Sequence, residues 1–494
     1  MMESEFTQRA SQIPAHGLGL SVDVYAPDVM HLVDTLREER LRPGYLEIFK
    51  ATTSAMQWVR QRLPEIKLTY HGEGLWVTQP DFPQSCSGRY GVAEACAQIA
   101  ALGSAWLNHE GATKQMAGYA FGTYLPPLYT ELSARMTAEN LDYLQGRLDA
   151  QARHHEGGPT LVLLEMPPLT YFACGSLGIP AFFRAVTDRV ACGLVLDIGH
   201  LWTVYRYTGA WRGQTLEAFV SEFLDAFPME RVIEIHVAGL AEFTTHNAPK
   251  DNAGGLALPF WIDGHGAPIP EVLFELLIQV LAHPRLRSLK GVALEVDTKP
   301  VAEIVTEFRR FLDRFEKTVH GVERASCVDS AQWNGPDTVQ HPDVRHALTP
   351  DDLATLRRQY QGYVELVTTP ERMPMTPELS LLGGSLDDLN RYRDAYLPHE
   401  LLHWGGELTD MFPRTCGLLT AANIPLEQFL SFWFDRPRRE QEDYDFFLLK
   451  IDRFVEFVAG GCPSACATVT VEAEELRTAY RAANEPIGSD EVRA

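Results

Sequence analysis

Histidine and glutamate stand at the spacing of a zinc-protease helix in the stretch YLPHELLHWGGEL. On a helix, His399 and His403 share one face and can hold a zinc ion, which leaves Glu400 as the general base. Such a site needs a third ligand, but Thr409 stands where one protease class has a histidine. Glu427 fits the other known arrangement only at a spacing that many glutamates meet by chance. We therefore interpret HELLH as a packing or partner-contact helix and keep a zinc protease as a minor alternative.

A larger set of acids and histidines follows the predicted strands of the first 300 residues. From the second strand to the eighth, each ends in a carboxylate or an imidazole, and WIDGHGAP adds a D-x-H pair. The set comprises Glu47, His71, His109, Glu110, Glu165, Asp197, His200, His236, Asp263, His265, Glu295 and Asp297. In a closed barrel of parallel strands, all strands end at one rim. These side chains are therefore expected to converge there.

The composition of this set indicates metal binding. Four or five carboxylates in one cavity repel one another unless cations lie between them. Carboxylate and imidazole ligands without thiolate suit iron, manganese or zinc. The set is larger than one ion needs, so it predicts two or three ions bridged by carboxylates. Asp263 and His265 can chelate from one loop, in which Gly264 and Gly266 leave the backbone free to turn.

The elements that must position these residues alternate between strands and helices. Short apolar runs rich in β-branched residues are separated by stretches with apolar residues at helical spacing. This alternation predicts an α/β fold with a parallel sheet, and eight units in about 300 residues suit a closed (β/α)₈ TIM barrel. The predicted strands are 17–22, 45–49, 67–72, 105–110, 161–166, 193–199, 232–239 and 292–297. The long gap between the fourth and fifth strands must hold an extra excursion, which contains GYAFGTYLPPLY.

The texture of the sequence changes at about residue 319. The polar, turn-rich segment 319–345 is predicted to be a linker. The barrel, with its metal-binding catalytic site, is expected to occupy residues 1–318. Residues 346–494 contain only helical patterns, so we expect a C-terminal all-α domain there. HELLH falls in this domain and is therefore expected to lie away from the barrel rim.

Charge and composition narrow the classes of partner. A formal net charge of −23 argues against a broad grip on nucleic acid or on an anionic membrane. No secretory signal and no membrane span is recognised, so we expect a cytoplasmic protein. The eight cysteines form no C-x-x-C pair and are interpreted as reduced structural residues.

At the predicted rim, the sequence resembles the multinuclear non-heme iron-dependent oxidative enzymes, formerly a domain of unknown function. Its best-known members resemble the methanobactin- and 3-thiaglutamate-biosynthesis enzymes, which modify peptides. The resemblance covers roughly residues 17–310. It rests on GLGL, YHGEGL, LPP, LLEMP, CGLVLDIGH, EIHVAG, IDGHGAP and LEVDTKP in this order. The family fold is similar to that of xylose-isomerase-like barrels, in agreement with the strand count.

The resemblance implies a set of iron ligands. These are His71, His109, Glu165, Asp197, His236, Asp263, His265 and Glu295, with Asp297 as a further candidate. Among them, we assign the catalytic roles to His71, Glu165, Asp263 and His265. Glu47, Glu110 and Asp297 are expected to orient the ligands from behind.

The sequence also departs from the family pattern. Gly199 and His200 replace an asparagine pair, Met166 replaces an asparagine, and Phe49 replaces a histidine. His200 is therefore a candidate ligand where the family has an amide.

The resemblance also implies an activity. The family uses two or three irons of mixed valence with O₂ as co-substrate, and oxidises a peptide side chain, most often cysteine, during natural-product biosynthesis. A separate companion protein normally binds the leader of the peptide substrate. Here the C-terminal helical domain is either a fused replacement for that companion or a buttress or dimerisation module.

Two other classes stay open. One is a divalent-metal isomerase or phosphodiesterase on the same barrel, although a nuclease would need a basic rim, which the strand-end loops do not offer. The other is a non-enzymatic scaffold, for which so many rim acids would have no use.

Overall fold

Eight parallel strands close into a barrel at the centre of the molecule. The computed structural model describes residues 2–152, 160–242, 258–329, 347–368, 376–403, 405–435 and 445–484. Around the barrel the strand order is β1-β12-β9-β8-β7-β4-β3-β2. The strands are β1 Gly17–Val22, β2 Tyr45–Phe49, β3 Lys67–His71, β4 Trp106–Glu110, β7 Leu161–Glu165, β8 Gly193–Asp197, β9 Val232–Val237 and β12 Gly291–Glu295. The predicted TIM barrel is confirmed, and each strand lies within about a residue or two of its predicted range.

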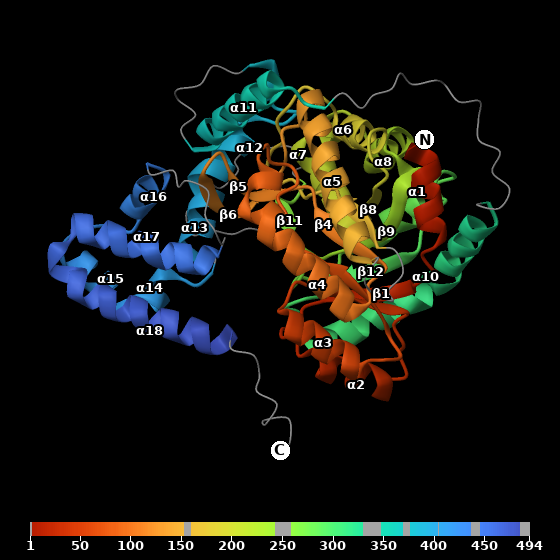
Figure 1. Cartoon of the computed structure of the whole chain (residues 1–494), viewed down its shortest axis with the longest axis horizontal. Coiled ribbons are helices and arrows are strands. Elements are labelled where there is room, and N and C mark those ends of the chain that lie inside the picture. The colour runs from red at the N-terminus through yellow and green to blue at the C-terminus, as the bar shows by residue number, and fades with distance from the viewer. Residues whose placement is uncertain are drawn as a thin grey trace.

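Helices surround the barrel on all sides (Figure 1). They are α2 Val29–Glu38, α3 Thr53–Arg62, α4 Val92–Leu102, α5 Glu131–Ala152, α6 Ile179–Thr187, α7 Ile198–Tyr207, α8 Leu216–Ala226, α9 Glu271–Leu281 and α10 Val301–Asp329. Several begin at a side chain that accepts a backbone N–H bond, as Asp28, Thr52 and Thr215 do. Their buried apolar faces pack on the outside of the strands and form the larger hydrophobic core.

The inside of the barrel has an apolar lower half. Tyr45, Trp106, Leu163 and Val195 form a separate buried cluster there, and the helix α1 Met2–Ser11 covers this end with Phe6. The ring of Tyr45 fits because its neighbours on both sides are glycines. A Cβ on Gly19 would lie 2.5 Å from that ring and one on Gly291 would lie 2.7 Å from its hydroxyl oxygen. The lower barrel is therefore a packed stem, and polar side chains concentrate above it.

Two short hairpins stand on the opposite rim. The first, β5 Thr113–Met116 with β6 Tyr119–Leu125, follows β4 and accounts for the predicted excursion. The second pairs β10 Leu240–Glu242 with β11 Trp261–Asp263 and follows β9. The second hairpin carries Asp263 to the rim, so its register fixes one of the predicted metal ligands.

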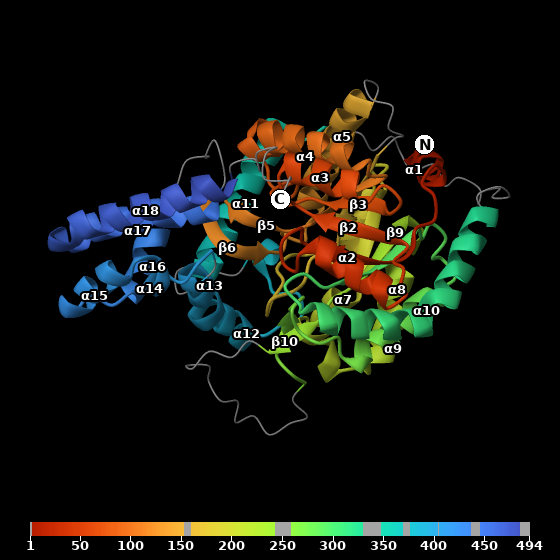
Figure 2. The same cartoon turned by 90° about the horizontal axis from the view of Figure 1, so that it is seen from below.

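The chain after the barrel is helical throughout its described residues. It contains α11 Pro350–Thr368, α12 Leu386–Arg391, α13 Leu397–His403, α14 Leu408–Met411, α15 Pro413–Ala421, α16 Glu427–Phe434, α17 Phe446–Gly461 and α18 Cys466–Asn484. A π-helical turn, Tyr392–Tyr396, joins α12 to α13. The helices α11 to α13 lie against the barrel, whereas α14, α15, α17 and α18 extend to one side (Figures 1 and 2).

The first hairpin is one attachment point of this helical region. Trp433 Nε1 donates to the carbonyl of Ala120 at 2.7 Å, and the ring of Phe434 packs on Phe121. Gly122 adopts φ +69°, and a Cβ there would lie 2.5 Å from the ring of Phe446. The helical region therefore clamps the hairpin over a glycine that leaves no room for a side chain.

The last barrel helix extends further than expected. Since α10 runs to Asp329, residues 319–329 of the predicted linker are helical. The rest of that linker, 330–345, lies outside the described residues, so the exact domain division stays a prediction. Within the described part of the chain, no helix is long and apolar enough to cross a bilayer.

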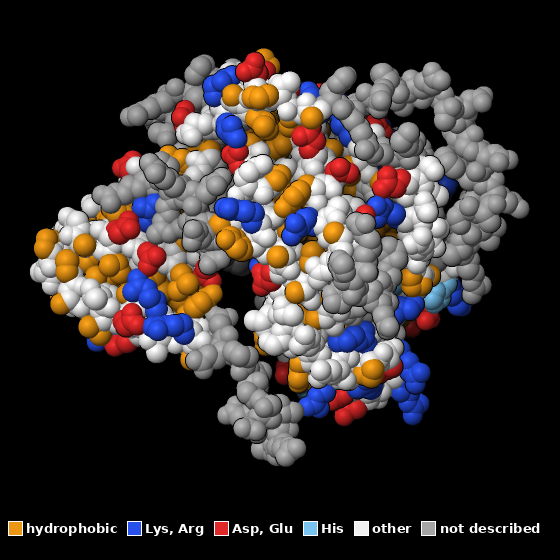
Figure 3. Space-filling view, in the orientation of Figure 1, with side chains coloured by type: hydrophobic (Ala, Val, Ile, Leu, Met, Phe, Trp, Pro, Cys, Tyr) orange, Lys and Arg blue, Asp and Glu red, His pale blue; other side chains and the backbone are white. Residues whose placement is uncertain are grey.

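The visible surface carries mixed charges. Figure 3 shows Lys and Arg interspersed with Asp and Glu, while hydrophobic side chains gather on the outlying helices. Leu418 of α15 and Val471 of α18 are among the exposed apolar residues there.

Candidate metal centre

Glu165 and His236 lie at the centre of the rim. Glu165 is the last residue of β7. His236 of β9 faces it, and His236 Nδ1 lies 3.3 Å from Glu165 Oε1. The same nitrogen is 3.2 Å from Glu295 Oε1, at the end of β12. On the other side of the ring, Nε2 lies 3.0 Å from Glu47 Oε2. Glu47 thus lies on the side of the His236 ring opposite to Nδ1, which faces the shared cavity.

Asp197 joins this centre and also begins a helix. It ends β8 and caps α7, since its Oδ1 accepts the backbone N–H of His200 at 2.6 Å. Its second oxygen, Oδ2, is buried and has no hydrogen-bond partner in the described part of the chain. His200 Nδ1–H donates to the Met166 carbonyl, 2.7 Å away, and its Nε2 lies 3.6 Å from Asp263 Oδ2. The histidine that replaces a family amide therefore faces the same cavity.

Asp263 and His265 approach from the second hairpin. Their closest side-chain atoms, Oδ2 and Nε2, are 3.2 Å apart. His265 Nε2 is also 3.5 Å from Glu295 Oε2, and its Nδ1 lies 2.5 Å from Asp297 Oδ1. The D-x-H pair thus forms one edge of the cluster, with Asp297 placed behind the imidazole.

His71 reaches the cluster from β3. Its Nε2 is 3.4 Å from Glu165 Oε2, and its ring stacks at 6.0 Å from that of His236. Asn108 of β4 donates its Nδ2 hydrogen to the same Glu165 oxygen at 2.7 Å. Glu165 therefore contacts partners from several strands and is the natural bridging carboxylate.

His109 does not join the cluster. Side chains alternate along a strand, and Trp106 of β4 points into the barrel, so Asn108 and Glu110 share the inner face while His109 faces the helices. There its Nε2 accepts the backbone N–H of Leu75 at 2.9 Å. Its Nδ1 lies 2.7 Å from the Glu110 carbonyl. Both ring nitrogens are thus engaged by backbone, which leaves none for a metal in this arrangement.

Burial and mutual charge shift the pKa values of these groups strongly. Burial alone would raise the pKa of Glu165, but His236 and His71 outweigh it and lower that pKa. Burial would lower the pKa of His236, yet Glu47, Glu295 and Glu165 raise it well above its usual value. The acids together thus draw positive charge into the cavity.

The pKa values of two other carboxyl groups in the cavity are raised instead. Burial, with the nearby charges of Glu295 and Asp263, raises the pKa of Asp197 to about 8, although His200 opposes the shift. Burial raises the pKa of Glu110 to about 7. Among the described residues, Glu110 makes no hydrogen bond to a histidine, so the geometry does not support its expected orienting role.

The donor set fits bound cations. Two groups have ligand atoms within 4.8 Å of one another: Glu47, His71 and His236; and Glu165, Asp197, His236 and Glu295. Several of their buried atoms, and neighbouring atoms of the cavity, lack a hydrogen-bond partner among the described residues. They include Glu47 Oε1, Asn108 Oδ1, Asp197 Oδ2, His200 Nε2, His236 Nδ1, Asp263 Oδ1 and Glu295 Oε2. Buried polar atoms are rarely left unsatisfied, so this pattern favours metal ligation.

HELLH lies closer to the barrel than the sequence suggested. Its helix, α13, packs against β6 of the rim hairpin, and Tyr396 just before it lies 3.3 Å from Thr123 through its hydroxyl. The rings of His399 and His403 are 4.3 Å apart. Among the described residues, neither histidine belongs to a group of three potential ligands. The packing interpretation therefore agrees with the structure, whereas the placement away from the rim was wrong.

Sequence reasoning missed Asn108 and a buried pair below the centre. Glu234 of β9 accepts the Tyr45 hydroxyl at 2.5 Å and lies 3.6 Å from His236 through Oε2. Burial and the charge of Glu47 raise the pKa of Glu234 to about 7. Strand alternation could have found both, because Asn108 and Glu234 stand two residues from Glu110 and His236.

A known protein family matches most of the barrel. The family described as RiPP precursor modification enzyme MbnB/TglH/ChrH matches residues 45–314. A UPF0276 protein of Caulobacter vibrioides is 27% identical over 273 residues, which cover 54% of this chain and 84% of the relative. Another, from Rhizobium meliloti, is 30% identical over 164 residues, which cover 33% of this chain and 44% of the relative.

Solved structures with a similar barrel are remote in sequence. Endonuclease IV from Thermus thermophilus is 16% identical, with a TM-score of 0.36, over 60% of this chain and 99% of that chain. A xylose isomerase domain protein from Planctomyces limnophilus is 13% identical, with a TM-score of 0.36, over 63% of this chain and 98% of that chain.

Proposed function

Because the chain belongs to the RiPP precursor modification enzyme family MbnB/TglH/ChrH, whose match spans more than half of it, we propose a specific reaction. The protein is a multinuclear iron enzyme that uses O₂ to oxidise a side chain, most often cysteine, of a ribosomally made peptide. The observation that carries the proposal is the position of Glu165. Its two oxygens face His236, His200 and His71, as a carboxylate that bridges metal ions requires.

The residues divide into three potential binding groups. Asp197, Glu165, His236 and Glu295 would hold one ion. Asp263, His265 and His200 would hold a second together with Glu295. His71 and Glu165, with Glu47 nearby, would hold a third if one is present. Bound iron would supply the one-electron redox chemistry that reduces O₂ and oxidises the substrate.

The surrounding residues position the ligands and keep water out. Asp297 and Glu47 fix the rings of His265 and His236, so the opposite nitrogen of each ring faces the cavity. Asn108 holds Glu165 from β4. Glu165, His236 and Asp197 are all buried, so the reacting groups are shielded from bulk solvent. This shielding suits an oxidation whose intermediates must not react with water.

The helical region is proposed to bind the peptide substrate. In this proposal it takes the place of a separate companion protein and holds the peptide while one side chain enters the barrel. Its support is the docking already described, in which α11 to α13 and α16 pack on the rim side of the barrel.

Metal analysis tests the proposal. Protein purified without oxygen should carry about two or three irons per chain, in keeping with the size of the ligand set. Glu165→Ala and His265→Ala should lower the iron content, whereas His403→Ala should leave it unchanged. Zinc alone in the purified protein would contradict the oxidase and favour the isomerase or phosphodiesterase alternative.

A further inference from the structure

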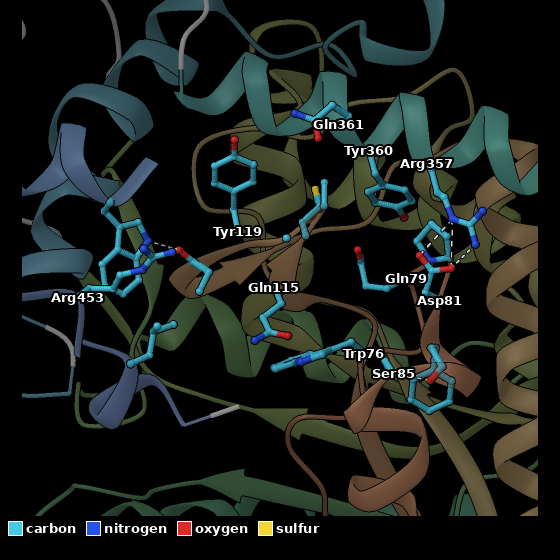
Figure 4. A pocket seen from close by; sticks show the side chains of 18 residues that line it. Trp76, Gln79, Asp81, Ser85, Gln115, Tyr119, Arg357, Tyr360, Gln361 and Arg453 are labelled. Carbon is cyan, nitrogen blue, oxygen red and sulfur yellow. Dashed lines mark hydrogen bonds and ion pairs between the residues drawn. The ribbon is translucent and has the colours of Figure 1, made fainter. Parts of the chain in front are cut away.

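A cavity of about 370 Å³ lies between the barrel and the helical region, outside the metal centre (Figure 4). Its walls come from the loop after β3, the turn of the β5–β6 hairpin, and the helices α11, α16 and α17. Neither part of the chain encloses it alone. The volume lies within the range of about 300–1,000 Å³ that is usual for ligand sites.

Five aromatic side chains line the cavity. Figure 4 shows Trp76 in the lower part of the view, with Tyr119 of the hairpin and Tyr360 of α11 above it on the left and the right. Phe82 and Trp433 complete the apolar lining. Such walls favour an apolar or aromatic guest, since flat rings offer large contact areas and pack well edge to face.

The polar groups of the cavity suit a peptide. Gln79, Gln115 and Gln361 offer amide groups, which can both donate to and accept from a peptide backbone. The charged residues already have partners: Arg357 Nε bonds Asp81 at 3.1 Å, and Arg453 Nη1 bonds Glu456 at 3.2 Å. A phosphate or another strong anion would therefore compete with existing carboxylates.

The hairpin wall is held in place before any ligand arrives. Met116 pairs with Tyr119 across the turn residues Ala117 and Gly118, whose φ values are +50° and +84°. Two residues of positive φ in a two-residue loop form the compact hairpin turn whose twist matches its strands. The Trp433 bond to the Ala120 carbonyl anchors the strand that follows. Binding would therefore cost little ordering of the wall.

The cavity is connected to the metal centre through one loop. That loop starts directly after His71, the last residue of β3. Its residue Leu75 donates to His109, and its residue Trp76 packs edge-on to the same imidazole at 6.2 Å. A peptide held against Trp76 would thus lie beside the rim on which the predicted ligands converge.

We propose that this cavity binds an apolar or aromatic side chain of the peptide substrate and so sets which neighbouring residue reaches the metal centre. The identity of the ligand as substrate rests on the proposed function, whereas the binding of a peptide here does not. The cavity is a recognition site built jointly by the barrel and the helical region.

Selection of peptides on the intact protein tests this site. The full-length, metal-loaded protein is used to select from a displayed library of random dodecapeptides, and the enriched peptides are measured by fluorescence anisotropy. Gln361→Trp fills the cavity from α11 and should weaken binding about tenfold or more, equivalent to about 1.4 kcal/mol. Arg358→Trp adds the same ring to the exposed side of that helix and should leave the affinity unchanged.

A second variant guards against misfolding of the first. Tyr119→Ser removes part of the wall and should weaken the same peptides while the melting temperature stays near that of the wild type. The enriched peptides should share an aromatic or large apolar residue. Failure to enrich any peptide, or peptides that bind Gln361→Trp as tightly as the wild type, would overturn the proposal.

The test separates this inference from the proposed function. If the protein carries the expected iron but its selected peptides bind Gln361→Trp as tightly as the wild type, only the proposed role of the cavity is contradicted. A protein that carries zinc alone but binds peptides in the cavity contradicts only the iron chemistry.

Discussion

Asp297 Oδ1 lies 2.5 Å from Nδ1 of His265, on the far side of the imidazole from the cavity. The charge of Asp297 helps to raise the pKa of His265 well above its usual value, against the effect of burial. A carboxylate behind a histidine fixes the orientation of the ring and makes the opposite nitrogen a better ligand. Nε2, on that opposite side, faces Asp263 and Glu295.

Asp297→Asn should therefore weaken metal binding without removing a direct ligand. The loss should be about 10- to 100-fold in affinity, as for other carboxylates that support a ligating histidine. Competition with a chelator, followed by metal analysis, measures it. Asp225→Asn is a matched control, because Asp225 faces His283 at 3.3 Å on the surface and should leave metal affinity unchanged. Equal metal affinities of the wild type and Asp297→Asn would show that Asp297 does not support metal binding.

Substitution of Asn108 and of His109, neighbours on β4, should have opposite effects on iron content. Asn108→Ala removes the hydrogen bond that holds Glu165, so the iron content should fall. His109→Ala should keep its iron but lose about 1–3 kcal/mol of stability, since the Leu75 N–H loses its buried acceptor. Metal analysis and denaturant unfolding distinguish the two. The reverse result, iron lost only in His109→Ala, would mean that His109 is a ligand.

Gly122→Ala should destabilise the junction between hairpin and helical region. The new methyl group would meet the Phe446 ring in a backbone conformation that favours glycine. Overpacking and the positive φ together should cost about 2–4 kcal/mol, measured by chemical unfolding. Gly146→Ala is the control, because Gly146 lies within α5 with nothing within 4 Å of a Cβ. That change should stabilise the protein by about 0.5–1 kcal/mol. An unchanged free energy of unfolding in Gly122→Ala would contradict this prediction and show that the Phe446 ring can shift to make room for the methyl group.

His16 should make the protein sensitive to acid. Burial lowers the pKa of His16 to about 4, and its ring packs against Trp106 and Tyr45 at the lower end of the barrel. Below pH 6.5 the unfolded chain takes up a proton that the folded protein refuses, so stability falls as the pH drops toward 4. The full effect is about 3 kcal/mol. His16→Gln should lose less stability than the wild type between pH 7 and 4 in urea unfolding. Parallel losses in both proteins would contradict the assignment.

Local patterns were enough to predict the barrel, because each strand is an apolar run bounded by turn residues. They also predicted most of the residues that now surround Glu165, since strand ends share one rim. The expectation that His109 is a metal ligand failed because side chains alternate between the two faces of a strand. The sequence HE at the end of β4 does not itself indicate which of the two residues points inward. Alternation from Trp106, a buried residue of the barrel interior, resolves it.

The position of the helical region was not predictable in the same way. It depends on contacts between residues far apart in the chain, such as Trp433 with Ala120 and Cys174 with Leu381. No periodicity or motif reports such a pairing. HELLH was therefore placed away from the rim, although α13 packs on β6.

The hairpin between the two parts also bears on how this architecture can evolve. Phe121 and Leu125 of β6 are fully buried, and Phe121 packs against Phe434 of the helical region. A gene shortened to end after α10 would encode a barrel with that contact uncovered, and an exposed apolar edge invites aggregation. Loss of the helices would therefore have to be accompanied by substitutions in the hairpin.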